Sequence, residues 1–220
     1  MLLERLCMRA DMRVPEVVVE SDVVASSWTA RGRIHVTSGL LELLDDAELE
    51  AVLAHELAHI AHRDAAVMEI CSAPSRMLLT FAGFVTPRLV RWMRAILRKR
   101  ETFSLALLIL AVLGLPPAFV MGWISRLSVL GMSRAREFSA DAAAVALTGR
   151  PSALASALLK LQRQCEWTPR ADLRQVEAFA VLCIVGTARH RLGRLFSTHP
   201  PIAARVERLE ETEMRLQAGF

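Results

Sequence analysis

The pentapeptide His55-Glu56-Leu57-Ala58-His59 constrains this chain more than any other stretch. It lies in a run whose apolar residues recur at helical spacing, and two histidines four positions apart project from one side of a helix. Both imidazoles can therefore reach a single cation, and neutral imidazole is a preferred ligand of zinc. The carboxylate of Glu56 would lie beside that cation, where it can accept a proton from water. We predict a zinc site with His55 and His59 as ligands and Glu56 as general base.

The residues around this motif favour a helix that packs against a core. Asp45 is suited to be the N-cap with Glu48 at the third helical position, which is a capping box. His55 and His59 are offset from the apolar stripe of the helix, so they are not simply core residues. The alternative, a chance pattern on a surface helix, is less consistent with this setting. The stripe consists of Leu49, Val52, Leu53, Leu57 and Ile60.

Composition and charge point to a membrane rather than to nucleic acid. The chain is 53% hydrophobic, and its net charge of +4 comes almost entirely from arginine, since only Lys99 and Lys160 are lysines. Tyrosine is absent and aromatic residues make up only 5%, so no stacking platform for bases is indicated, and we expect no nucleic-acid partner. Anionic lipid headgroups better explain arginines beside apolar segments. The four cysteines form no C-x-x-C pair, which excludes a cysteine metal knuckle and favours a reducing compartment.

The region before the motif predicts a small sheet. Val17-Val18-Val19 indicates a strand over residues 16–20, and residues 33–37 form a second strand after the turn residues Arg31-Gly32. A third strand is expected within residues 23–30. Together they predict a small antiparallel sheet that packs on the H-E-x-x-H helix, which is an α+β arrangement.

The middle of the chain predicts a membrane-associated insertion. We expect the motif helix to end near Ser72, before Pro74. The arginines of residues 88–100 recur every three or four positions, which predicts either a helix lying on a membrane surface or a solvated helical face.

Thr102 to Ser125 carries no charged residue and as a helix would reach about 36 Å, more than the roughly 30 Å of a bilayer's hydrocarbon core. Gly114 and Pro116-Pro117 predict a kinked span or two half-helices that enter and leave on one side. A buried soluble helix is the alternative.

The C-terminal third predicts three helices and a rigid turn. The helices are expected over residues 133–148, 152–161 and 202–216, and the turn is Thr198-His199-Pro200-Pro201. Phe179 to Val185 fits either a strand or a buried helical turn. We therefore divide the chain into residues 1–75, a membrane-associated insertion at 76–130, and residues 131–220.

Glu137 is the best candidate for a third metal ligand. His62 is separated from His55 by about 10.5 Å along the helix, too far for both to bind the same ion as His59. Glu137 and Asp141 lie four positions apart on one helical face, so Glu137 can bind the metal while Asp141 orients a ligand imidazole. A solvated acidic pair is the alternative, because such spacings are common.

This combination resembles the HtpX-like membrane zinc peptidases, a gluzincin group that also includes the CAAX prenyl proteases. The resemblance implies a mostly helical α+β gluzincin fold with a small N-terminal antiparallel sheet and an inserted membrane-embedded helical segment. It also implies one Zn²⁺ on His55, His59 and Glu137. His199 would stabilise the transition state or contact the resting metal, unless it is only a turn histidine. The resemblance runs through most of the chain and is carried by residues 36–41, 53–64, 133–141 and 197–201, with Arg205 and Leu209.

The function implied is a zinc metalloendopeptidase of the cell (inner) membrane with its site facing the cytoplasm. Its partners would be the lipid bilayer and polypeptide substrates, including misfolded membrane proteins in quality control. A zinc-binding membrane scaffold or regulator without turnover is the alternative. HtpX-like proteins usually begin with two membrane spans that this sequence lacks, so we expect a short variant or a fragment. Because Glu137 must lie on the same side as His55, we favour a re-entrant hairpin that turns at Gly114 to Pro117 over two full spans.

Overall fold

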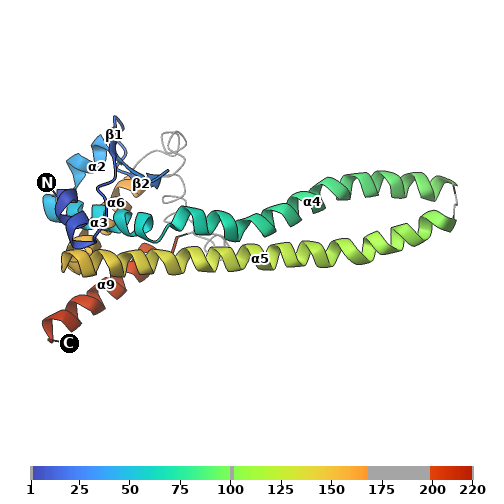
Figure 1. Cartoon of the computed structure of the whole chain (residues 1–220). Coiled ribbons are helices and arrows are strands. Elements are labelled where there is room, and N and C mark those ends of the chain that lie inside the picture. The colour runs from blue at the N-terminus through green and yellow to red at the C-terminus, as the bar shows by residue number, and fades with distance from the viewer. Residues whose placement is uncertain (1, 100–101, 168–198, 220) are drawn as a thin grey trace. The chain divides into compact units, whose positions relative to one another are not determined.

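The computed structural model describes residues 2–99, 102–167 and 199–219, and it describes only the backbone of residues 92–93, 95–99, 102–116, 118 and 165–167. The chain divides into two compact units, a split unit (Met1–Ala65 with Met132–Phe220) and an inserted unit (Ala66–Gly131). Figure 1 labels the elements in chain order. They are α1 (Leu2–Arg9), β1 (Val17–Glu20), β2 (Ser27–Ala30), β3 (Arg33–Thr37), α2 (Ser38–Leu43), α3 (Asp46–Ala61), α4 (Asp64–Lys99), α5 (Thr102–Thr148), α6 (Pro151–Trp167) and α9 (Ile202–Gln217).

The sheet has three strands in the order β1-β3-β2 and is mixed, so the prediction of an antiparallel sheet is wrong for β1. β2 and β3 form an antiparallel hairpin whose two turn residues, Arg31 and Gly32, have φ of 51° and 76°. Positive φ at both positions is typical of the tight turn that suits such hairpins. Because the chain reverses between β1 and β2 and again between β2 and β3, β1 runs in the direction of β3 and pairs with it in parallel.

The start of α3 is fixed by the predicted capping box. The side chain of Asp45 accepts hydrogen bonds from the backbone of Ala47 and Glu48, and Glu48 Oε2 accepts one from Asp45 N at 3.0 Å. Glu48 also accepts hydrogen bonds from Ser156 and Lys160 of α6. Burial alone would raise the pKa of Glu48, but these hydrogen bonds, first that of Lys160, lower it below its ordinary value. The helix that carries the motif is thereby attached to α6.

The core of the split unit joins residues from both halves of the sequence. α3 packs on α6, and α6 packs on α9. Because these helices come from both sides of the insertion, the two parts of the split unit share one core. Its largest fully buried apolar side chains include Leu6, Ile34, Leu40, Leu57 and Leu154.

Several helix ends differ from the prediction. α3 ends at Ala61, and α4 begins at Asp64 after Arg63 with φ of 52°, so the expected continuation of α3 to Ser72 is wrong. Pro74 lies inside α4, because a proline removes one intrahelical hydrogen bond without having to end a helix. α5 is helical through residues 114–117, so the re-entrant turn expected there is also wrong. The candidate strand Phe179 to Val185 lies outside the described residues.

The inserted unit consists of a pair of helices, most of α4 and the first part of α5. They lie side by side in Figure 1, and a Cβ added to Gly122 of α5 would approach Leu79 Cδ2 of α4 to 2.9 Å. Among the residues that the structure describes, no helix is long and apolar enough to cross a membrane. Most side chains of the uncharged stretch 102–125 lie outside that description, so its membrane insertion stays a prediction. Large apolar side chains are exposed on both helices: Ile70, Met77, Phe81, Phe84, Phe119, Val120, Met121, Ile124 and Leu127.

Candidate metal centre

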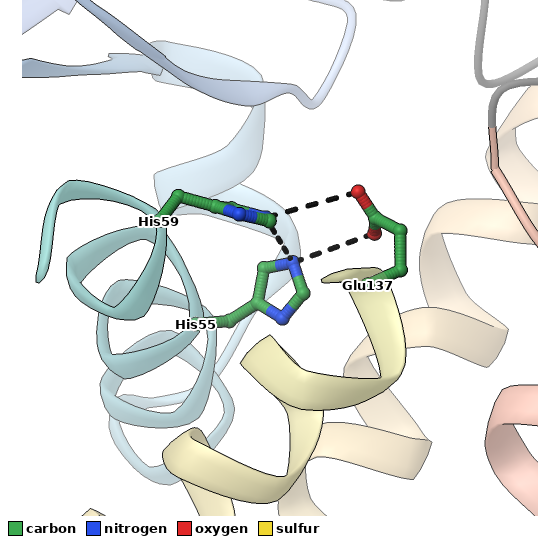
Figure 2. A group of neighbouring side chains, drawn as sticks. All are labelled: His55, His59 and Glu137. Atoms are coloured by element: carbon green, nitrogen blue, oxygen red, sulfur yellow. Dashed lines mark hydrogen bonds and ion pairs between the residues drawn. The ribbon is translucent and has the colours of Figure 1, made fainter. Parts of the chain in front are cut away.

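The predicted metal ligands come from two helices of the split unit. His55 and His59 project from α3, and Glu137 projects from α5 toward them (Figure 2). One ligand atom from each of the three residues lies within 4.8 Å of the other two. His55 Nε2 lies 3.1 Å from His59 Nε2 and 3.7 Å from Glu137 Oε2, and His59 Nε2 lies 3.8 Å from Glu137 Oε1. Two imidazole nitrogens and one carboxylate converging in this way are a donor set that fits a catalytic zinc ion.

A carboxylate lies behind each imidazole. His55 Nδ1 is 3.0 Å from Asp141 Oδ1, and His59 Nδ1 is 2.5 Å from Asp64 Oδ2. Such contacts fix the ring orientation and keep the other nitrogen, Nε2, directed at the metal position. Sequence reasoning identified Asp141 but missed Asp64. The only local feature of Asp64 is that it is an acidic residue at the start of α4, the helix that follows the motif.

Two arginines neutralise these carboxylates. Arg205 of α9 is 4% exposed and contacts Asp141 through two nitrogens, at 2.6 and 2.8 Å, and Glu137 Oε2 at 3.2 Å. Arg136 forms an ion pair with Asp64 and donates to the carbonyl of His62. His62 is the C-cap of α3. Among the described residues, the group that could hold a metal ion consists of His55, His59 and Glu137 and does not include His62. No local pattern in the sequence indicates the role of either arginine, because each partner lies far away along the chain.

The electrostatics favour metal binding. Burial would raise the pKa of Glu137, but the hydrogen bond from His199 and the charges of His55 and Arg205 hold that pKa well below its usual range. The pKa of Asp141 is likewise lowered, against its burial, by His55 and Arg205. Burial and the neighbouring His55 lower the pKa of His59 to about 4. At neutral pH Glu137 is therefore anionic and His59 neutral, the protonation states that a metal ligand requires.

Comparison with known proteins identifies the family. The model of peptidase family M48 matches residues 1–213. The chain belongs to peptidase family M48. Protease HtpX homolog 1 of Streptomyces coelicolor is 38% identical over 94% of this chain and 68% of its own length. Protease HtpX homolog 2 of Methanosarcina mazei is 35% identical over 98% and 72%, and the Protease HtpX homolog of Pyrococcus furiosus is 34% identical over 100% and 74%. The predicted resemblance to HtpX-like proteases is confirmed, and this M48 chain is a metalloprotease that acts on polypeptides.

The remaining predicted residues of this M48 protease also lie near the cluster. His199 Nδ1 is 3.0 Å from Glu137 Oε1, and 28% of its side chain is exposed. Glu56 is buried, and its carboxylate accepts hydrogen bonds from Ser27 and Thr29 of β2. Sequence reasoning missed both hydroxyls, since nothing in the spacing of a strand indicates which helix its side chains will meet.

Proposed function

We propose that this M48 protease is a zinc-dependent, membrane-associated endopeptidase whose metal ligands are His55, His59 and Glu137. The observation that carries the proposal is the convergence of these three side chains within 4.8 Å, with each imidazole backed by its own carboxylate. Zinc bound there would act as a Lewis acid that polarises the scissile carbonyl and makes water a stronger nucleophile.

The residues of the chain then have distinct roles. Glu56 accepts the proton of the attacking water and returns it to the leaving amine. Asp141 and Asp64 hold the imidazoles in place, and Arg205 keeps Glu137 and Asp141 charged inside the protein. His199 lies partly exposed beside Glu137, and we assign its ring to stabilising the negative charge that develops on the substrate in the transition state.

The substrate and the cellular location are also proposed. An extended polypeptide would lie along β2, because β2 is an edge strand of the described sheet and β-strand addition is a common way to bind peptides. The exposed apolar side chains of the inserted unit favour contact with the lipid bilayer, and the arginines of α4 favour anionic headgroups. We therefore place the protease at the cell (inner) membrane with its site facing the cytoplasm, where it would degrade misfolded membrane proteins.

A paired measurement tests the function. The chain is purified in detergent as wild type and as Glu56→Gln, bound metal is identified by mass spectrometry, and cleavage of dye-labelled, unfolded casein is followed. We expect about one zinc per chain in both proteins and a loss of at least about 100-fold in kcat for Glu56→Gln, because a positioned general base contributes on this scale. EDTA should abolish wild-type cleavage and Zn²⁺ should restore it. Equal cleavage by both proteins would contradict the role of Glu56, and a different bound metal would contradict zinc.

A further inference from the structure

Strand β2 directs two hydroxyl groups at the carboxylate of Glu56. Ser27 Oγ lies 2.8 Å from Glu56 Oε1, and Thr29 Oγ1 lies 2.8 Å from Glu56 Oε2. The two residues are two positions apart in the strand, so their side chains share one face of the sheet. Trp28 between them stacks on His35. Both oxygens of one buried carboxylate are therefore held by donors from a single strand.

Strand β2, which carries these hydroxyls, is fixed in place by its pairing with the buried residues of β3. Ser27 pairs with Val36 and Thr29 pairs with Ile34 in the β2–β3 ladder, and Val36 and Ile34 are both buried. Just before β2, Ser26 N donates to Thr37 Oγ1 at 2.9 Å and Ser26 O accepts from Thr37 N at 3.1 Å. Donors on an element anchored in this way fix a side chain more closely than donors on a loop would.

We infer that Ser27 and Thr29 are positioning residues that orient the Glu56 carboxylate for proton transfer, an inference that rests on the proposed role of Glu56 as general base. An ionised carboxylate offers about four lone-pair sites, so two hydroxyl donors leave sites on both oxygens free to accept a proton from water. The hydroxyls also couple the position of the base to β2, the strand along which the substrate is proposed to lie. Neither hydroxyl needs to contact the substrate.

The test removes the hydroxyls with little change in shape. Thr29→Val keeps the β-branched side chain that suits a strand, and it is combined with Ser27→Ala in the full chain. We expect kcat on dye-labelled casein to fall about 10- to 100-fold, the scale on which misplaced catalytic groups reduce rates, while KM changes less than about twofold. Zinc content should stay at the wild-type value and the protein should stay folded at the assay temperature, with a lowered midpoint of thermal unfolding because the buried Glu56 loses two hydrogen bonds. Thr212→Val in α9, the same chemical change away from the site, is the matched control and should leave all four quantities unchanged.

Two further variants separate positioning from general damage. Thr29→Ser restores a hydroxyl at the same position, so combining it with Ser27→Thr should recover most of the lost kcat. In a Glu56→Gln background, Ser27→Ala with Thr29→Val should lower the residual rate no further, because groups that act as a unit are not additive.

Three results would overturn the inference: an unchanged kcat in the double variant, no recovery with the hydroxyl-retaining pair, or an equal loss in the Glu56→Gln background. Hydrolysis by the wild type that does not depend on Glu56 would overturn the proposed function and this inference together. Glu56-dependent hydrolysis that is indifferent to the hydroxyls would overturn the inference alone.

Discussion

The split and inserted units handle polar and apolar groups in opposite ways. In the split unit charged side chains are buried and matched with partners: Glu48 with Lys160, Asp64 with Arg136, and Asp141 with Arg205. The described part of the inserted unit buries only small or apolar groups, at Ser75, Ala82, Gly122 and Leu130. Many of its large apolar side chains are exposed instead, with Met77 73% and Phe81 61% exposed.

This difference determines how each unit should respond to substitution. A charge buried away from water is costly unless it is paired, so removing one member of a pair leaves the other uncompensated. Substituting one member of these buried charge pairs should therefore have a large effect on stability or metal binding. An exposed apolar surface contributes to lipid binding in proportion to its total area. Substitutions in the inserted unit should therefore weaken membrane binding in proportion to the apolar area that they remove.

The largest effect is expected from Arg205→Met. This change leaves the buried Asp141 and Glu137 without their shared cation, and breaking a buried ion pair in this way costs about 3–5 kcal/mol. Urea unfolding of the metal-free protein measures the free energy of unfolding. Hydrogen exchange at the amides of α3 and α9, as a second experiment, measures the local loss of stability. Arg208→Met is the matched control, because Arg208 lies one turn further along α9, exposed over the ring of Phe138, and should cost about 1 kcal/mol or less. Equal costs would show that the buried pairs contribute nothing specific.

Acid should destabilise the metal-free split unit in two steps. The pKa of His59 is about 4 in the folded protein, against an ordinary value of 6.5 for the unfolded chain. Between these pH values only the unfolded state binds the proton, so stability falls as the pH falls. Below the ordinary carboxyl pKa values, the lowered pKa values of Glu137, Asp141 and Glu48 add a loss of the same sign. Urea unfolding at a series of pH values between neutral and acid tests this. His59→Asn should flatten the first step, and an unchanged slope in that variant would contradict the assignment.

Asp64→Ala should weaken zinc binding without removing a ligand. Asp64 lies 2.5 Å from His59 Nδ1, and loss of such a partner typically costs 10- to 100-fold in metal affinity. Competition with a fluorescent zinc chelator measures the dissociation constant. Glu69→Ala, at an exposed position of α4, is the control and should leave it unchanged. An affinity unaltered by Asp64→Ala would mean that Asp64 serves only its ion pair with Arg136.

The features that the sequence predicted are those with local signals. The H-E-x-x-H spacing, the Glu137–Asp141 spacing and the Asp45 capping box each lie within about one turn of helix, and the structure brings the three predicted metal ligands together. The binding of zinc by these three residues stays a prediction.

Features that depend on distant parts of the chain were missed. Arg205 contacts Asp141 from 64 positions away, and Ser27 contacts Glu56 from 29 positions away, so no periodicity marks either contact. The parallel pairing of β1 depends on which edge of β3 the hairpin leaves open, which a strand's own residues do not indicate. The helix end predicted before Pro74 and the turn predicted at residues 114–117 are wrong because a proline weakens a helix only locally. The neighbouring turns still maintain the helix.

The smallest effect on the split unit is expected from substitutions in the inserted unit. Met77 and Phe81 lie one turn apart on α4, and replacing both with serine should change the stability and zinc affinity of the split unit by less than about 0.5 kcal/mol, as is usual for surface positions. The same change should weaken binding to vesicles of phosphatidylcholine and phosphatidylglycerol at least about tenfold, since burying one such side chain contributes about 1.5–3 kcal/mol. Vesicle sedimentation measures this, and Met77→Leu with Phe81→Leu is the matched control that keeps the surface apolar. If the serine variant bound vesicles as tightly as the leucine variant, these side chains would not contact lipid. If it instead lost zinc, the two units would be energetically coupled, and the contrast between them would fail.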